Sequence, residues 1–286
     1  MNRSSAASPT DGLAVNTLTI WWDDAADGPT NMALDECLAA EAERRGGLLL
    51  RFYGWSETTV SLGGFQKLED ALQIDAIHGV PLVRRPSGGG AIVHGSDLTY
   101  AAAVPKSHPW GGLPQLFYDA LHGAMVAVLA DQGIRAWRHA AGGPRAAGGP
   151  HAAGEIAPSH DESLFFCFDR RASGDLLMEG PAAGTGSKIM GSAQRRLAGV
   201  VLQHGSLLLR GNTGVGGAAR HSSVADIVAE PPLPRDSELS RDWGHRIARE
   251  LGATLYEETA PFVRGRESAV EAVAARFREP RWTARR

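Results

Sequence analysis

The feature that most constrains the fold is a series of short apolar or β-branched stretches between residues 48 and 104, separated mainly by glycine and serine. Stretches of this kind, bounded by turn-forming residues, predict β-strands at 48–53, 58–62, 82–85, 91–94 and 98–104. Only one helix, at 68–78, is predicted among them. Because so few helices alternate with the strands, the pattern predicts an α+β fold with a mixed, largely antiparallel sheet and flanking helices.

The rest of the sequence fits the same class. A strand is predicted at 18–22, followed by a helix at 31–45 that has Thr30 as its N-cap and ends at Gly46 and Gly47. The apolar spacing of 113–132, with Gly133 at its end, predicts a long packed helix. Further strands are predicted at 176–179, 187–194 and 200–209, and further helices at 240–251 and 268–277.

Length and composition describe an ordinary globular protein. With 286 residues, 43% hydrophobic and 21% charged, it can bury a substantial core in one large domain. We expect a disordered N-terminus at 1–15 and one domain at 16–286, which has a flexible, Ala-, Gly-, Pro- and His-rich insertion near 140–158 and a helical C-terminal part. No apolar run approaches the ~18 residues that span a bilayer, and the N-terminus lacks a secretory signal, so we expect no membrane association and a cytoplasmic location.

The two cysteines, Cys37 and Cys167, stand in no CxxC or Cys/His cluster of metal-ligand spacing. We therefore expect neither a disulfide framework nor a metal site. Cys37 lies on the apolar face of the helix predicted at 31–45, so we interpret it as a core residue. The net charge of −3 argues against binding to nucleic acid, which usually requires a basic excess.

A glycine-rich segment between two predicted strands carries the first candidate site, and it reads Arg84-Arg85-Pro86-Ser87-Gly88-Gly89-Gly90-Ala91-Ile92-Val93-His94. Glycines let the backbone approach a ligand with no Cβ in the way, and their amides can bind a carbonyl or a phosphate. His94 adds a group that titrates near neutral pH. The segment is neither a Walker A loop nor a GxGxxG fingerprint. From these residues alone, a tight hairpin flanked by surface arginines is an equally good interpretation.

Two other stretches extend this pattern. One reads Asn31-Met32-Ala33-Leu34-Asp35-Glu36, and the other contains Gly186-Ser187-Lys188-Ile189-Met190-Gly191-Ser192-Ala193 and then Leu202-Gln203-His204-Gly205-Ser206-Leu207. Together with the glycine-rich segment, they resemble the family of lipoate-protein ligases and octanoyltransferases. The resemblance implies a fold like that of class II aminoacyl-tRNA synthetases and biotin ligases. It also implies a substrate-binding site that contains Arg84, Arg85, Ser87, Gly88, Gly89, Gly90, His94, Gly191, Ser192, Ala193 and His204.

The stretch Phe166-Cys167-Phe168-Asp169 resembles the segment that carries the nucleophile in octanoyltransferases of the Gram-positive type. Such an enzyme takes an octanoyl or lipoyl group from acyl carrier protein as a cysteine thioester. It then passes the group to a lysine of a lipoyl domain or of the glycine-cleavage H protein, without a cofactor. Only a thiolate attacks a thioester at a useful rate, so a cation is needed near a sulfur among phenylalanines. Lys188 is the candidate for that cation, and it can also bind the acyl carbonyl.

Other interpretations stay open. An ATP- and Mg-dependent lipoate-protein ligase would use Lys188 and the glycine-rich segment without Cys167, and Gly90 is more typical of the ligases. An amidotransferase between carrier proteins would share Cys167, and a non-catalytic carrier-binding protein would keep only the fold. From the residues alone, Cys167 can be a buried side chain in an aromatic strand, Lys188 a solvated surface lysine, and His204 a partner in a strand hydrogen bond.

Two departures from the family pattern bear on these interpretations. The family has an aspartate directly after the motif histidine, whereas here Gly95 and Ser96 precede Asp97. Because fewer than 80 residues follow Leu209, we expect no accessory domain like that of many two-domain ligases, and this expectation favours transfer.

Overall fold

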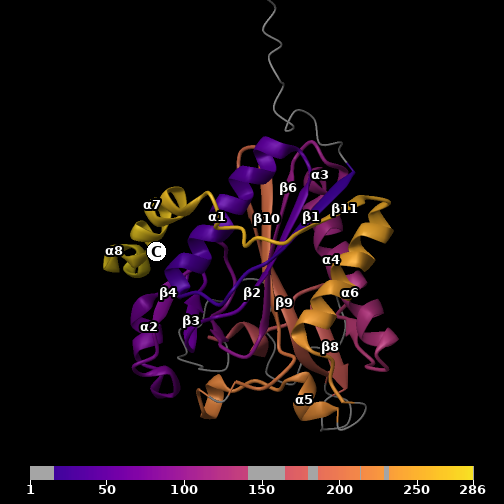
Figure 1. Cartoon of the computed structure of the whole chain (residues 1–286). Coiled ribbons are helices and arrows are strands. Elements are labelled where there is room, and N and C mark those ends of the chain that lie inside the picture. The colour runs from indigo at the N-terminus through magenta and orange to yellow at the C-terminus, as the bar shows by residue number, and fades with distance from the viewer. Residues whose placement is uncertain (1–15, 141–164, 180–185, 213, 229–231, 286) are drawn as a thin grey trace, which may run out of the picture.

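An eight-stranded sheet forms the centre of the protein (Figure 1). The computed structural model describes residues 16–140, 165–179, 186–212, 214–228 and 232–285. In spatial order the strands are β11 (Thr254–Glu258), β1 (Thr17–Trp22), β2 (Leu48–Tyr53), β6 (Leu98–Pro105), β10 (Val200–Leu207), β9 (Gly186–Arg196), β8 (Leu176–Glu179) and β7 (Trp137–Arg138). Strand β1 runs parallel to β2 and β11, and the other pairs are antiparallel. This confirms the predicted α+β class with a mixed, largely antiparallel sheet and flanking helices.

Helices cover both faces of this sheet (Figure 1). On one face, α4 (Pro114–Asp131) and α6 (Asp236–Leu251) share a hydrophobic core with the strands. On the other face, α1 (Gly28–Arg45) and α7 (Glu267–Arg278) form a second core. Because side chains alternate along a strand, Leu48 and Leu50 of β2 enter the first core and Leu49 enters the second.

A smaller, three-stranded sheet lies beside the large one and carries the glycine-rich segment. Its order is β4 (Leu82–Arg84), β3 (Thr59–Leu62) and β5 (Ile92–His94), and α2 (Leu68–Leu72) packs nearby. The remaining described helices are short: α3 (Pro109–Gly112), α5 (Val224–Ile227), α8 (Pro280–Ala284) and the 3-10 helices η1 (Asp75–Ile77), η3 (Cys167–Asp169) and η4 (Gly217–Ala219).

The first predicted helix starts earlier than expected. Thr30 is not its N-cap, because the carboxylate of Asp27 accepts a hydrogen bond from the Thr30 amide at 2.8 Å and caps the helix. Pro29 fits the first turn, where its missing N–H is not needed. The end of the helix is as predicted, with Gly46 in the left-handed conformation at φ 90°.

The helix predicted at 68–78 is also wrong as a single element. It ends after Leu72, Ile74 is extended, and a separate 3-10 helix follows. This break lets Ile74 and Ile77 enter the core of the small sheet together with Ala71. Strand β11 was not predicted, since it is a mostly exposed edge strand with no alternating apolar pattern.

Other expectations fall outside the described residues. They include the disordered N-terminus at 1–15 and nearly all of the insertion near 140–158.

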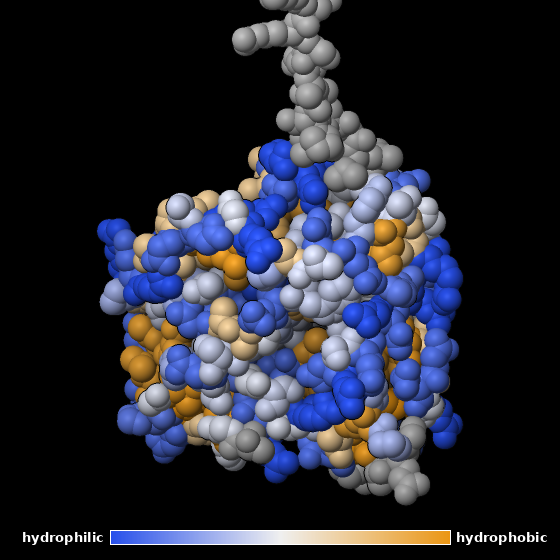
Figure 2. All heavy atoms as spheres, in the orientation of Figure 1, coloured by the Kyte–Doolittle hydropathy of each residue, from blue (hydrophilic) through white to orange (hydrophobic). Residues whose placement is uncertain are grey.

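None of the described helices is long and apolar enough to cross a lipid bilayer. On the face of the molecule in Figure 2, hydrophobic side chains lie in separate patches between hydrophilic ones.

Candidate active site

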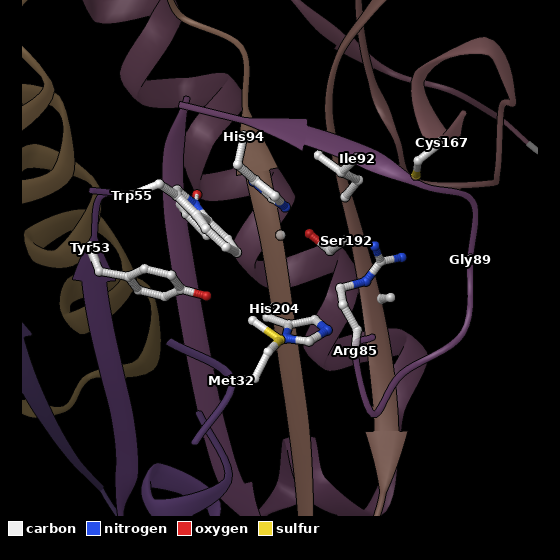
Figure 3. Close-up of a pocket in the computed structure, with 13 residues that line it drawn as sticks. Met32, Tyr53, Trp55, Arg85, Gly89, Ile92, His94, Cys167, Ser192 and His204 are labelled. Atoms are coloured by element: carbon white, nitrogen blue, oxygen red, sulfur yellow. Dashed lines mark hydrogen bonds between the residues drawn. The ribbon is translucent and has the colours of Figure 1, made fainter. Parts of the chain in front are cut away.

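A pocket is lined by residues of both sheets, and it encloses about 400 Å³ of empty space including its open mouth (Figure 3). Aromatic and apolar walls come from Met32, Tyr53, Trp55 and Ile92. The polar lining consists of Arg85, His94, Thr99, Ser192, His204 and the thiol-bearing Cys167. A narrow, mainly apolar pocket with a few convergent polar groups is the usual form of a small-molecule site.

Cys167 lies at the start of the 3-10 helix η3, where it lines the pocket and is partly exposed. Two backbone hydrogen bonds fasten its segment to Ala91: the Ala91 amide donates to Phe165 at 3.0 Å, and the Cys167 amide donates to Ala91 at 2.7 Å. A Cβ at position 90 would lie 2.7 Å from the Cys167 nitrogen, so this close approach requires Gly90. Cys167 is therefore not a side chain within an aromatic strand.

Lys188 lies on β9 beside Cys167. Its ammonium is 3.5 Å from the Cys167 sulfur, and it donates to the Cys167 carbonyl at 3.0 Å and to the Arg170 carbonyl at 3.2 Å. The side chain is buried, so the surface-lysine interpretation is wrong. A Cβ at position 191 would lie 2.5 Å from the lysine Cε, and only glycine leaves room for this conformation.

A buried carboxylate balances the charge of Lys188. Asp175 lies 2.8 Å from the ammonium and accepts a hydrogen bond from the Tyr118 hydroxyl at 2.8 Å. Burial alone would lower the pKa of Lys188, but Cys167 and Asp175 outweigh it and raise that pKa above its ordinary value. The lysine therefore stays protonated at neutral pH.

The two arginines of the glycine-rich segment have different surroundings. Arg84 does not line the pocket, and its guanidinium donates to backbone carbonyls of Gly63, Gln66 and Thr283. Arg85 lines the pocket and donates to both oxygens of Ser61 and to the Gly90 carbonyl. Both side chains are buried, so the hairpin with surface arginines is wrong.

His94 forms a triplet with Ser61 and Asp97, which we name the His94 triplet. The Ser61 hydroxyl lies 2.7 Å from Nε2 of the ring, and Nδ1 lies 2.8 Å from Asp97. Burial lowers the pKa of His94 despite Asp97, so the ring is neutral, Nδ1 donates to the carboxylate and Nε2 accepts from Ser61. For Asp97, burial alone would raise the pKa, but His94 and hydrogen bonds from Ser206 and the Gly95 amide lower it to about 2.

His204 forms a second triplet with Ser87 and Asp35, the His204 triplet. Its Nδ1 lies 3.0 Å from Asp35, and its Nε2 forms a hydrogen bond with the Ser87 hydroxyl. Asp35 also accepts from Arg51 and from the Tyr53 hydroxyl, both at 3.1 Å. The triplet thus connects α1, β10 and the glycine-rich segment.

Ser192, which lines the pocket, belongs to a hydrogen-bond chain with a fixed direction. His122 must donate from Nδ1 to the Gly174 carbonyl at 2.8 Å, because a carbonyl only accepts. Burial lowers the pKa of His122 to about 3, so its Nε2 accepts from Ser192 at 2.7 Å. Tyr100 then donates to Ser192, also at 2.7 Å. Ser192 therefore has only a lone pair to offer a ligand.

The structure brings together most of the residues predicted for the site. Those that line the pocket are Arg85, Gly89, His94, Cys167, Ser192, Ala193 and His204. The other predicted residues do not line the pocket, but Lys188, Gly90, Ser87 and Gly88 contact members of its lining. Arg84 and Gly191 do not line it either. Cys37 is partly buried against the second core, as expected for a core residue. Among the described residues, no group of three or more His, Cys, Asp or Glu side chains could hold a metal ion.

The sequence interpretation missed the buried acids and the second layer of the site. Asp97 is three residues from His94, a spacing that could have suggested the contact. Asp35 stands in the quoted stretch 31–36, but nothing local pairs it with His204, 169 positions away. Asp175 and His122 carry no motif signal, and only the fold brings them to the site.

Solved structures of lipoate-protein ligases share this fold. The bi-partite lipoate protein ligase of Thermoplasma acidophilum matches with a TM-score of 0.65 at 19% identity, covering 94% of this chain and 96% of that one. Lipoate-protein ligase A bound with ATP matches with a TM-score of 0.64 at 19% identity, covering 94% and 98%. At such identities the similarity concerns the fold alone.

The sequence defines the family more closely. The model of the lipoyl protein ligase A/B catalytic domain matches residues 27–233, and the chain belongs to this family. Octanoyltransferase LipM of Geobacillus kaustophilus (strain HTA426) is 37% identical over 182 residues, which are 63% of this chain and 60% of that protein. Octanoyltransferase LipM of Bacillus subtilis (strain 168) is 35% identical with the same coverage. The chain thus spans 60% of the length of these curated relatives, and the family expected from the motifs is confirmed.

Proposed function

We propose that this protein is an octanoyltransferase that moves an octanoyl or lipoyl group from acyl carrier protein to a lysine of a lipoyl domain or of the glycine-cleavage H protein. The reaction takes place in the cytoplasm through a Cys167 thioester and needs no cofactor. The observation that carries this proposal is the 3.5 Å contact between the Cys167 sulfur and the Lys188 ammonium at the wall of the pocket. The similarity to proteins named octanoyltransferase supports it.

In the first step the Cys167 thiolate attacks the carbonyl carbon of the donor thioester. A bond forms between Sγ and the acyl carbon, the bond to the carrier sulfur breaks, and the carrier thiolate leaves and takes up a proton. The Lys188 ammonium stabilises the attacking thiolate by donating a hydrogen bond to the sulfur. It can then donate to the acyl oxygen as negative charge develops there.

In the second step the neutral amine of the target lysine attacks the same carbon. A C–N bond forms, the C–S bond breaks, and Cys167 is released as a thiolate beside Lys188 while the amine loses one proton. The apolar walls formed by Tyr53, Trp55 and Ile92 surround the acyl group and limit access of water to the thioester.

The test is to incubate the purified protein with octanoyl-acyl carrier protein and apo H protein, without ATP, and to determine intact masses. We expect an octanoyl adduct on the enzyme and then octanoyl H protein. Cys167→Ala removes the adduct and lowers transfer by at least about a thousandfold, because the nucleophile is lost. Cys37→Ala is the matched control, since it removes the other cysteine outside the pocket, and it retains the adduct and the transfer.

Other outcomes would contradict the proposal. Transfer that requires free octanoate and ATP, with Cys167→Ala fully active, would identify a ligase. A folded protein that binds the carrier but forms neither adduct nor product would be a non-catalytic carrier-binding protein.

Lys188→Ala is expected to lower adduct formation by about a hundredfold, because the thiolate and the acyl oxygen lose their hydrogen-bond donor.

A further inference from the structure

The positive charge of Lys188 is already balanced within the site. Asp175 is fully buried at 2.8 Å from the ammonium, so the two groups form a neutral pair. Such a pair can donate a hydrogen bond to a thiolate, but it adds no net positive charge. A thiolate in the pocket beside this pair alone would therefore be a negative charge with no net positive charge to balance it, which is costly where water is partly excluded.

A second cation in the pocket has no such balance. Arg85 is 3% exposed, and its guanidinium contacts only neutral acceptors: Ser61 O at 2.5 Å, Ser61 Oγ at 2.7 Å, Gly90 O at 2.8 Å and Gly88 O at 3.2 Å. Its Nε has no hydrogen-bond partner among the residues that the structure describes. Within the part of the chain that the structure describes, no carboxylate contacts this guanidinium. Burial lowers the pKa of Arg85 to about 10, so the group remains charged at neutral pH.

The unbalanced guanidinium lies close to Cys167. Arg85 donates to the Gly90 carbonyl, and Gly90 is packed so tightly on Cys167 that a Cβ would lie 2.7 Å from its nitrogen. Both side chains line the same pocket, and Figure 3 shows the guanidinium pointing to the side on which Cys167 lies. After burial, which lowers the pKa of Arg85, Cys167 has the next largest influence and raises that pKa.

The His94 triplet fixes the position of this charge. Ser61 accepts from the guanidinium and donates to the neutral His94 ring, which in turn donates to the Asp97 carboxylate. Every hydrogen bond in this series therefore has one direction, from Arg85 to Asp97. Aligned hydrogen bonds polarise one another, so the series holds the guanidinium without placing a carboxylate next to it.

We propose that Arg85, positioned by Ser61, His94 and Asp97, supplies the net positive charge that favours the thiolate of Cys167. Lys188 has the separate role of donating the hydrogen bond. The proposal rests on the proposed function only in taking Cys167 as the nucleophile. A nearby opposite charge in a poorly solvated site shifts a protonation equilibrium by about ten- to a thousandfold.

The experiment measures the rate at which iodoacetamide alkylates Cys167 as a function of pH, by intact mass, in a Cys37→Ala background. Iodoacetamide is uncharged, so Arg85 does not attract or repel the reagent itself. We expect Arg85→Gln to move the midpoint of the pH profile upward by about one unit, which lowers the rate about tenfold below that midpoint. Arg85→Lys restores most of the shift because it restores a cation.

The control is Arg84→Lys, which changes the neighbouring buried arginine outside the pocket and is expected to leave the midpoint in place. A folded Arg85→Gln variant with an unchanged midpoint would overturn the proposal, and so would a change confined to the KM for the acyl donor. If Arg85→Gln does not fold, Arg85→Met keeps an unbranched, uncharged side chain that replaces the aliphatic part of arginine, and it decides the same question. Failure of the proposed function would be seen separately, as absence of the Cys167 octanoyl adduct in the wild-type protein.

Discussion

The His94 triplet and the His204 triplet contain the same residue types in the same order. Each histidine lines the pocket and lies between an aspartate and a serine. In both, Nδ1 carries the proton that faces the aspartate, because a carboxylate can only accept. Two such similar arrangements in one pocket could be expected to do the same work.

The residues around the two triplets differ, and they indicate different structural roles. Asp35 is shared with the charged Arg51, and its triplet ends at Ser87 in the glycine-rich segment. Asp97 contacts no arginine or lysine among the described residues, and its triplet ends at the guanidinium of Arg85. The His204 triplet therefore fixes the position of a loop, whereas the His94 triplet fixes the position of a charge.

The largest effect that separates the triplets is expected for Asp97→Asn. Asp97 accepts from His94, Thr99, Ser206 and the Gly95 amide, and the amide variant cannot accept from all of them. We expect the free energy of unfolding at pH 7 to fall by about 3 kcal/mol, measured by urea denaturation. The exposed Asp24→Asn serves as the control, with a change of less than about 0.5 kcal/mol.

The same variant tests a pH dependence. The folded pKa of Asp97, about 2, lies below its ordinary value of 3.8, so its ionisation stabilises the folded state above about pH 4. This contribution is lost as the pH falls from about 4 to about 2, and it amounts to about 2 kcal/mol. Asp97→Asn is expected to remove that part of the acid dependence. An unchanged slope in this range would show that the carboxylate of the His94 triplet is not held ionised by its partners.

A smaller effect is expected from Ser87→Ala, which removes the serine of the His204 triplet. Nε2 of His204 then loses its hydrogen-bond partner, at a cost of about 1 to 2 kcal/mol in unfolding free energy. Because the loop that holds Gly90 against Cys167 loses an anchor, we expect adduct formation to slow about tenfold. The midpoint of the alkylation profile should not move, since no charge is removed. A shift of that midpoint equal to the one in Arg85→Gln would mean that the two triplets are equivalent.

The sequence predicted most of the secondary structure, but few of the charged and polar partners in the site. Strands such as β2 and β6 were predicted closely because apolar residues fill both of their faces and glycine or serine marks their ends. Strand β11 was missed, since an exposed edge strand needs no apolar pattern and is held by pairing with β1. The helix predicted at 68–78 was too long. Its apolar spacing fits one continuous helix, but it fits a short helix followed by a 3-10 helix equally well, because both arrangements place the apolar side chains in the core.

For the site, motif residues were predictable and their partners were not. The glycine-rich segment, Cys167 and Lys188 could be proposed from the sequence because the resemblance preserves their local order, and the structure places Arg85, Gly89, His94 and Cys167 in the pocket wall with Lys188 beside it. Asp175, which pairs with Lys188, and Arg51, which pairs with Asp35, gave no local signal. Each buried ion pair forms only because the fold brings together residues that are distant in the sequence. The different roles of Arg84, the last residue of β4, and Arg85, the next residue, were also hidden, because only the fold decides which of the two side chains reaches the pocket.

The smallest effect, and the sharpest comparison, is expected from Tyr53→Phe. This variant removes one neutral donor from Asp35 while keeping the aromatic ring over Arg51, whose guanidinium carbon lies 3.9 Å from the ring centre. Because Arg51 and His204 still hold the carboxylate, the unfolding free energy should fall by only about 0.5 to 1 kcal/mol. Thr99→Val, which removes one neutral donor from Asp97 and the acceptor of the Trp55 indole, should cost clearly more. If the two variants cost the same in urea denaturation, Arg51 does not distinguish the aspartates, and the division between a loop-holding and a charge-holding triplet is wrong.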